Sequence, residues 1–348
     1  MSTPPARLVV GVDSGGSGVR VALADAAGPG APEVVEARTP VRTGPAGIDA
    51  QHLLELVLPM VRALFVRTGR EVQGTGPGAV VAAVAVGAAG MATLGGQLRT
   101  ELPGALATAL GVRRLALAAD AVTAYAGALG QRPGAVVAAG TGVIALGTDL
   151  SGWRRADGWG HLLGDCGSGA WIGRAGLEAA MRAHDGRRGG STALLAAAES
   201  VWGPVTGLPG HLYPRTDRPA VLASFAPHVA RCAVEGDPVA TQVLTRAAGH
   251  LVEAAAAVCP PAQQGAAQGD GVDVALTGGL FAMGDPLVVP LREQMAAQLP
   301  AARLVPAVGD PLAGSVSIAA ALADGSLRLP TDPALLHVPT DAPAERGR

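Results

Sequence analysis

Two glycine turns, one in each half of the chain, constrain the fold more than any other feature. The first lies in GVDSGGSGVRVAL, where Val19, Val21 and Leu23 alternate after the glycines. The second lies in AVVAAGTGVIALG, which repeats the order of strand, glycine turn and strand. Alternation with period two is typical of a strand, so each turn is predicted to join the two strands of a hairpin. A dinucleotide-binding fingerprint needs a helix directly after its glycines, which excludes that fold for the first turn.

The remaining pattern alternates strands with helices and predicts an α/β protein. Further strands are expected at 33–38, in AVVAAVAVGAAG, in RRLALAAD, in VDVALTGGL and in RLVP. Helices are expected at 48–67, from Asp120 to about 129, from about 170, through most of 190–258 and after Asp310. The segment PPAQQGAAQGDG is predicted to be a surface loop. We predict domains at 1–118 and 119–325, followed by a loose tail at 326–348.

Composition excludes several classes of protein. The 348 residues are 49% hydrophobic and carry a formal net charge of −2, which argues against binding to nucleic acid or to a membrane surface. The 26 basic residues are all arginine, and without lysine neither a Walker A loop nor a Schiff base can form. The 3 cysteines are far apart and predict no zinc site or disulfide framework. We expect a cytoplasmic protein, and a homodimer is one option.

Glycine turns expose backbone N–H groups that can hold phosphate oxygens. A single such turn can equally be a plain β-turn. The chain, however, contains the pattern of strand, glycine turn and strand twice, and it has a further glycine turn in LTGGL near its end. The residues of these turns that could hold phosphate are Ser14, Gly15, Gly16, Ser17, Thr141, Gly142, Gly278 and Gly279.

These three turns together resemble the phosphate and adenosine loops of the actin-like ATPase superfamily. The resemblance implies that the turn residues named above contact ATP. The segment GWGHLLGDCGSGAWIGRAGLEA is more specific. It resembles the N-acetylglucosamine kinase branch of the BadF/BadG/BcrA/BcrD ATPase family, with the actinobacterial glucosamine kinases as the most similar subgroup. The resemblance extends from Arg7 to about Leu322. It implies a two-domain, ribonuclease H-like sugar kinase fold that binds a nucleotide in the cleft between its domains.

The resemblance also implies roles for individual residues. Asp120, at the end of an apolar strand, would be the general base that accepts the proton of the sugar's 6-hydroxyl. Asp13 would be an outer-sphere partner of Mg²⁺, which keeps much of its own water. The sugar would be contacted by Asp120, Asp157, Gly158, Trp159, Gly160 and Asp165.

Each of these residues also has a purely structural alternative. Asp120 and Asp165 could cap the helices that follow them, and Asp13 could stabilise its turn. Trp159 could belong to a core instead of stacking on a pyranose ring, and Asp157 could be an ordinary exposed loop residue. His161 is most simply structural.

The family pattern and this chain differ around the sugar's second carbon. The loop PVRTGPAGID lacks an asparagine, VGAAGM lacks a serine, and Cys166 stands where a glutamate is common. Altered contacts near Thr43 and Ala88 fit a free amine as well as an acetamide, and Asp157 is a candidate carboxylate partner for the amine. The prediction is an ATP- and Mg²⁺-dependent glucosamine kinase that makes glucosamine 6-phosphate, with N-acetylglucosamine kinase as the alternative.

Three other readings are weaker. A dehydratase-activating ATPase needs cysteines for an iron–sulfur cluster, and no suitable pair exists. A sugar-sensing repressor would carry a DNA-binding module before the first strand, where only about six residues are found. A glucokinase of the repressor/ORF/kinase type would carry a cysteine-rich zinc motif, which is missing.

Overall fold

The computed structural model describes residues 7–26, 31–69, 81–261 and 271–339. The chain forms two compact units. The first contains Met1–Arg132, Asp149–Trp153 and Ala307–Arg348, and the second contains Pro133–Thr148 and Arg154–Pro306. These units group 119–132 and 307–325 with the N-terminal part of the chain, whereas the sequence placed them in the second domain; the division at 118/119 stays a prediction. Each unit is described below by itself.

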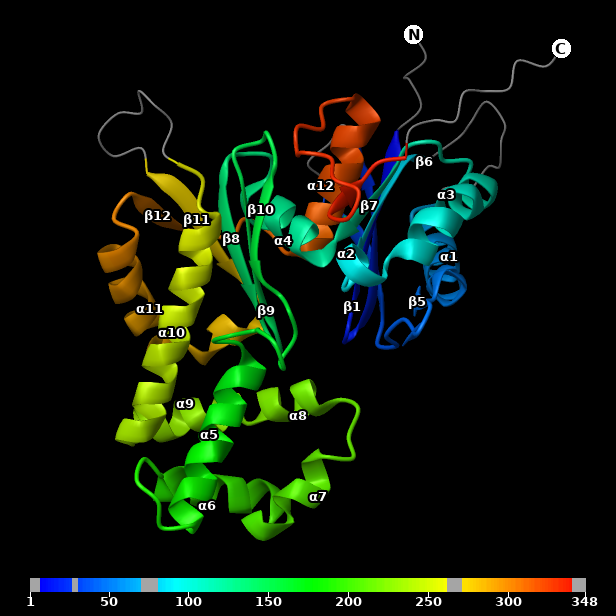
Figure 1. Ribbon diagram of the computed structural model, residues 1–348. Coiled ribbons are helices and arrows are strands. Elements are labelled where there is room, and N and C mark those ends of the chain that lie inside the picture. Colours follow the sequence, from blue (N-terminus) through cyan, green and yellow to red (C-terminus); the bar gives the residue numbers. More distant parts are fainter. Residues whose placement is uncertain (1–6, 27–30, 70–80, 262–270, 340–348) are drawn as a thin grey trace, which may run out of the picture. The chain divides into compact units, whose positions relative to one another are not determined.

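The first unit is built on a six-stranded mixed sheet in the order β13-β7-β6-β1-β2-β3 (Figure 1). Its strands are β1 (Leu8–Gly15), β2 (Gly18–Asp25), β3 (Glu33–Ala37), β6 (Val81–Ala88), β7 (Leu115–Ala119) and β13 (Leu336–His337). β1 and β2 form the predicted hairpin, with Gly15 opposite Gly18. β1, β6 and β7 are parallel, and Ser14 pairs with Ala88, which pairs with Ala119. The carboxyl ends of these three strands therefore meet at one edge of the sheet.

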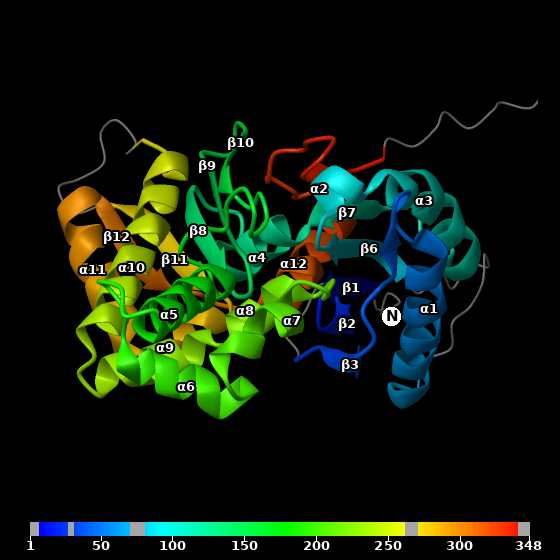
Figure 2. The same ribbon diagram turned by 60° about the horizontal axis from the view of Figure 1, so that its bottom comes forward.

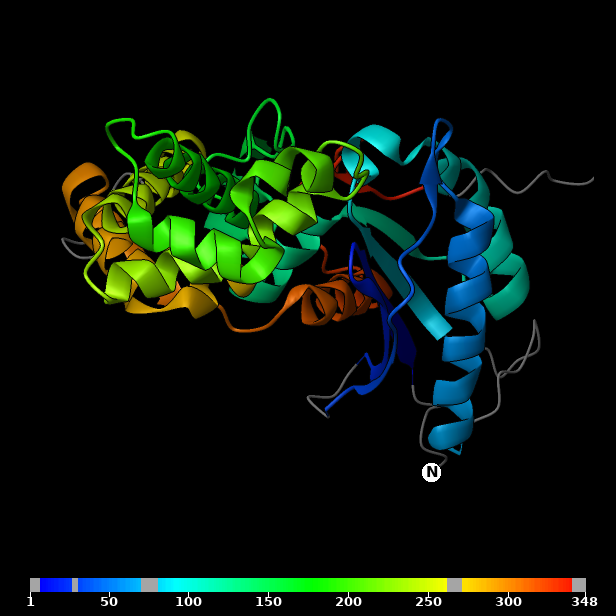
Figure 3. The same cartoon turned by 90° about the horizontal axis from the view of Figure 1, so that it is seen from below.

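Helices cover both faces of this sheet, α1 and α3 on one and α4 and α12 on the other (Figure 3). Their bounds are α1 (Ala50–Arg67), α2 (Met91–Leu94), α3 (Gly96–Leu110), α4 (Asp120–Leu129) and α12 (Pro311–Asp324), with a small β4–β5 ribbon (Thr43–Gly44, Gly47–Ile48) before α1. The periodicity of α1 is confirmed, since the predicted stripe is buried along its length: Leu53, Val57, Met60, Val61 and Leu64. Asp49 caps α1 and Asp310 caps α12 through side-chain bonds to backbone N–H groups.

The expectation of a loose tail after residue 325 is wrong for the described part of that segment. Leu329 is 3% exposed and Leu336 is fully buried. β13 pairs antiparallel with β7, and the Trp153 indole donates to the Pro330 carbonyl at 2.7 Å. Burial of these apolar side chains outweighs the Pro- and Ala-rich composition on which the expectation rested.

The second unit contains a five-stranded sheet in the order β10-β9-β8-β11-β12. Its strands are β8 (Gly134–Ala139), β9 (Val143–Thr148), β10 (Trp153–Asp157), β11 (Val272–Thr277) and β12 (Ala302–Pro306). The β8–β9 pair is the second predicted hairpin, with Ala139 opposite Val143. The sequence did not predict β10, in which three of the five residues are charged and none is buried. The predicted loop at 260–271 lies mostly outside the described residues.

The second unit also contains a layer of helices. They are α5 (Gly169–His184), α6 (Thr192–Trp202), α7 (Leu208–Leu212), α8 (Arg218–Ser224), α9 (Ala226–Val234), α10 (Pro238–Val258) and α11 (Asp285–Gln298), with short 3₁₀ turns at Val205–Gly207 and Gly279–Met283. α6, α8 and α9 pack around α5 (Figure 2), and α10 packs against both α5 and the sheet. Within the described ranges of both units, no helix is both long and apolar enough to cross a bilayer.

Candidate active site

The first glycine hairpin ends at the carboxyl edge of the first sheet. β1 and β2 continue through Ser14, Gly15 and Gly18, so that Gly16 and Ser17 alone form the turn. Both turn residues are exposed, whereas Ser14 is 5% exposed and its carbonyl accepts from the Ala89 N–H at 2.8 Å. A Cβ placed on Gly15 or Gly16 would have no described atom outside its chain neighbours within 4 Å. The space over this turn is therefore open to a ligand.

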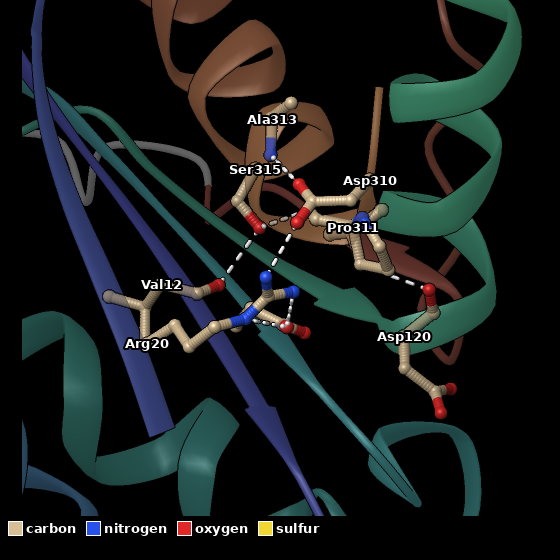
Figure 4. Close-up of polar contacts among 9 residues, drawn as sticks. Val12, Arg20, Asp120, Asp310, Pro311, Ala313 and Ser315 are labelled. Carbon is tan, nitrogen blue, oxygen red and sulfur yellow. Dashed lines mark hydrogen bonds and ion pairs between the residues drawn. The ribbon is translucent and has the colours of Figure 1, made fainter. Parts of the chain in front are cut away.

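Asp13, the predicted magnesium partner, belongs to a cluster of three charges in the first unit (Figure 4). The Arg20 guanidinium on β2 donates to Asp13 Oδ2 at 2.6 Å and to Asp310 Oδ2 at 2.5 Å. Asp310 is the cap of α12 and accepts from the Ala313 N–H at 2.9 Å. Burial by itself would raise the pKa of the Asp310 carboxyl. The Ala313 N–H and Arg20 have the larger effect in the other direction, so the pKa lies below its ordinary value. Arg20 thus ties the strand that carries Asp13 to the start of α12.

Asp120, the predicted general base, is the first residue of α4 and follows β7 directly. The N-cap position itself is Ala119, so Asp120 stands one residue inside the helix. One Asp120 oxygen accepts from the Ala121 N–H at 2.9 Å, and its carboxylate points away from Arg20 and Asp310 in Figure 4. A carboxylate there also interacts favourably with the positive end of the α4 dipole, so a purely structural role for Asp120 stays open. Strand register places Asp120 at the same sheet edge as Ser14.

The second glycine hairpin is held by the helix that follows the signature segment. The Gly140 and Thr141 carbonyls accept from the N–H groups of Gly169 and Ala170, at 2.9 and 3.0 Å. These donors belong to the first turn of α5, whose cap is Ser168. Thr141 itself is exposed. The N-terminus of α5 therefore holds the hairpin turn, and the turn's carbonyls already accept from its first N–H groups.

Two carboxylates, those of Asp157 and Asp165, accept backbone hydrogen bonds within the segment between β10 and α5. Asp157 accepts from the N–H groups of Asp165 and Cys166, at 2.5 and 2.9 Å. Asp165 accepts from the Gly160 N–H at 3.3 Å and from the Val143 N–H on β9. Both aspartates have positive φ, 59° and 54°, a conformation that needs such compensation. Asp157 and Asp165 therefore build the loop that contains the GWG sequence.

The position of the Asp165 side chain also explains why residue 142 is a glycine. A Cβ on Gly142 would lie 2.6 Å from Asp165 Oδ2, so glycine at 142 makes room for that carboxylate. Asp165 is 9% exposed. Burial, and then the charge of Asp157, raises the pKa of the Asp165 carboxyl above its ordinary value. The alternative role for Asp165 as the cap of α5 is wrong, because Ser168 accepts from Trp171 in that position.

Trp159 is not a core residue. It is 62% exposed, and its neighbours in the same loop, Leu162 and Leu163, are 80% and 85% exposed. Three large apolar side chains in one loop of a chain that is only 3% aromatic form an unusual surface. The structural alternative for Trp159 is excluded, and the predicted role as a sugar platform stays open.

The third glycine turn follows β11. Gly278 and Gly279 are both exposed; Gly278 directly precedes the 3₁₀ turn Gly279–Met283, and Gly279 begins it. Gly278 has φ +100°, and a Cβ there would collide with the Ala139 carbonyl at the end of β8. A Cβ on Gly279 would meet open space. Gly278 is thus required by the protein's own packing, whereas Gly279 is free to face a nucleotide.

The residues present fit ATP with Mg²⁺ better than a protein-held metal. Among the described residues, no group of three or more His, Cys, Asp or Glu side chains could hold an ion by itself. Mg²⁺ bound to a nucleotide is held mostly by phosphates and water, for which the single carboxylate of Asp13 suffices. Asp13 is already paired with Arg20, so it would act through water or by sharing its carboxylate.

Sequence reasoning missed Arg20, Asp310 and Arg155. Arg20 and Asp310 are 290 residues apart, and no local pattern joins them. Arg155 lies 4.4 Å from the ring centroid of Trp159. The available signal for that contact was the position of this arginine, three residues before Gly158.

Comparison with known proteins agrees with this geometry. A structure of a candidate N-acetylglucosamine kinase from Chromobacterium violaceum is similar to this chain, with a TM-score of 0.67 and 28% identity, over 90% of this chain and 99% of that one. A glucokinase of the ROK family from Streptomyces griseus, solved with glucose and AMPPNP, shares the fold at a TM-score of 0.52 and 20% identity, over 91% and 98% of the two chains. The predicted actin-like α/β sugar kinase fold is confirmed.

A curated relative matches a shorter stretch. The N-acetylmuramic acid/N-acetylglucosamine kinase of Clostridium acetobutylicum is 43% identical over 76 residues, which is 22% of this chain and 24% of that protein. The match thus spans about a quarter of that relative's length. The family model, in contrast, extends over residues 10–314. The chain belongs to the BadF/BadG/BcrA/BcrD ATPase family.

Proposed function

We propose that this protein is an ATP-dependent kinase of an amino sugar, transferring the γ-phosphoryl group to the sugar's 6-hydroxyl. The single observation that carries the proposal is the placement of Asp120. It follows β7 at the sheet edge that also ends the first glycine hairpin, as the first residue of α4. The family and the named relatives support a sugar as the acceptor.

The reaction balances as a substitution at phosphorus. The sugar's 6-oxygen forms a bond to the γ-phosphorus while the bond from that phosphorus to the β,γ-bridging oxygen breaks, and ADP leaves. Asp120 accepts the proton of the 6-hydroxyl and later releases it to water; such a base contributes roughly 10²–10⁴-fold. Backbone N–H groups of the glycine turns hold phosphate oxygens. When bound, Mg²⁺ neutralises charge on those oxygens.

The identity of the amino sugar is the finer part of the proposal. Glucosamine was predicted with Asp157 as the partner of its amine, but both Asp157 oxygens accept backbone N–H groups. The two named relatives point to N-acetylglucosamine. We therefore place N-acetylglucosamine first and retain glucosamine as the second candidate, on the strength of the altered loops near Thr43 and Ala88.

A coupled assay of ADP release tests both parts. The acceptors are N-acetylglucosamine, glucosamine, N-acetylmuramic acid, glucose and N-acetylmannosamine, each with ATP and Mg²⁺. We expect catalytic efficiency to be highest for N-acetylglucosamine, by at least tenfold over glucose. A preference for glucosamine would restore the sequence-based prediction. No sugar-dependent ADP release with any acceptor would overturn the kinase proposal.

A further inference from the structure

One cation is stacked on the exposed tryptophan of the signature loop. Arg155 lies in β10, and its guanidinium carbon is 4.4 Å from the centroid of the Trp159 ring. A guanidinium at this distance over an indole forms a cation–π contact. Trp159 nevertheless remains 62% exposed. Arg155 thus covers one face of the ring, and a large part of the ring surface stays open.

The backbone fixes the guanidinium in that position. Arg155 Nε donates to the Asp157 carbonyl at 3.1 Å, and Nη2 donates to the Gly158 carbonyl at 2.6 Å. These are the two residues directly before Trp159. Because the donors of a guanidinium form a rigid planar fork, two bonds determine the plane of the group as well as its place. The orientation of the ring therefore follows from the path of the backbone.

Glycine at 158 makes this arrangement possible. Gly158 has φ +76°, and a Cβ there would lie 2.9 Å from Ile144 Cδ1 and 3.2 Å from Arg155 Nη2. Any other residue would meet both the β9 side chain and the guanidinium. Asp157 holds the far end of the loop through Asp165 and Cys166. The ring is thus supported from β10 and from the base of its own loop.

We propose that Arg155 is a positioning residue for the acceptor sugar. It holds Trp159 so that the uncovered face of the indole receives the apolar C–H face of the hexosamine ring. This inference rests on the proposed function, and it assigns to Arg155 a role in acceptor affinity with no role in phosphoryl transfer. An arginine needed only for the fold would affect stability without distinguishing the sugar from ATP.

The test measures steady-state kinetics of Arg155→Met and Arg155→Lys, with Arg154→Met as the matched control. Arg154 is the exposed neighbour in the same strand. We expect Arg155→Met to raise the KM for N-acetylglucosamine about tenfold, with the KM for ATP and kcat within about twofold. Arg155→Lys keeps the positive charge but not the planar guanidinium. Its KM for N-acetylglucosamine should lie between those of the unsubstituted protein and Arg155→Met. Arg154→Met should match the unsubstituted protein. Equal rises in both KM values would overturn the proposal.

A double-mutant cycle with Trp159→Leu separates positioning from a general effect. If Arg155 acts through the ring, Arg155→Met should change the sugar KM less than twofold in the Trp159→Leu background. A full tenfold rise there would contradict the proposal. Binding of N-acetylglucosamine followed by tryptophan fluorescence gives a readout independent of turnover. Sugar-dependent quenching that Arg155→Met diminishes would support positioning, even where the phosphoryl acceptor proves to be another sugar. Sugar-dependent quenching that is as strong in Arg155→Met and in Trp159→Leu as in the unsubstituted protein would overturn the proposal.

Discussion

The two glycine hairpins have the same pattern in sequence but different supports in the structure. The first turn, at Gly16 and Ser17, is flanked by charge: Asp13, Arg20 and Asp310 lie beside it, and its glycines face open space. The second, at Gly140–Gly142, is held by α5 backbone donors and packs against the Asp165 carboxylate. Gly16 and Gly142 therefore differ in their surroundings, with open space at the first and internal packing at the second. The contrast belongs to these two residues, since Gly18 of the first hairpin is packed against the Ala37 carbonyl and Gly140 of the second faces open space.

The largest expected effect concerns Asp120, the base at the edge shared with the first hairpin. Asp120→Asn keeps size and polarity but cannot accept the proton. We expect kcat to fall at least a hundredfold, the lower end for a lost general base, with ATP and sugar binding within a few-fold. Titration calorimetry and the coupled assay measure the two quantities. Near-normal turnover would show that Asp120 only stabilises the N-terminus of α4.

A pair of glycine substitutions sharpens the comparison directly. Gly16→Ala adds a methyl group to open space, so we expect stability within about 0.5 kcal/mol of the original and an ATP KM raised about tenfold. Gly142→Ala places a Cβ against the Asp165 carboxylate. It should lower the free energy of unfolding by about 1–3 kcal/mol. Denaturant titration of both variants is the measurement. Equal destabilisation would contradict the different causes assigned to the two glycines.

Much of this contrast was outside the reach of the sequence. Local periodicity predicted both hairpins, α1 and the strand before Asp120, because those signals lie within a few residues of one another. The Arg20–Asp310 pair and the pairing of β13 with β7 join distant segments, for which no local signal exists. Asp157 and Asp165 were predicted to contact the sugar, because a sequence does not show from which backbone N–H groups a carboxylate accepts hydrogen bonds.

The charged cluster beside the first hairpin predicts a moderate loss of stability. Arg20→Met removes the partner of Asp13, whose side chain is only 16% exposed, and of the half-exposed Asp310. We expect a loss of about 1–2 kcal/mol, mostly from the less exposed pair. Arg20→Lys, which keeps the charge, should recover part of it. A thermal melt that is unchanged in Arg20→Met would show that the cluster contributes nothing to stability.

The smallest expected effect is a pH dependence at the second hairpin. Burial and Asp157 raise the pKa of Asp165 in the folded protein, so its ionised form disfavours the folded state. That cost is present above the folded pKa and disappears as the pH falls to the unfolded value near 3.8. The stability of Asp165→Asn relative to the unsubstituted protein should therefore decline as the pH is lowered from 7 toward that value. A pH-independent difference would contradict the shift.

The most direct test of the central claim is the structure of the product. Incubation with ATP, Mg²⁺ and N-acetylglucosamine, followed by ³¹P–¹H correlation NMR, identifies the carbon that carries the new phosphate. The account predicts a phosphomonoester whose phosphorus couples to the two protons on carbon 6. A phosphate on carbon 1, or ADP formed without a phosphorylated sugar, would contradict it.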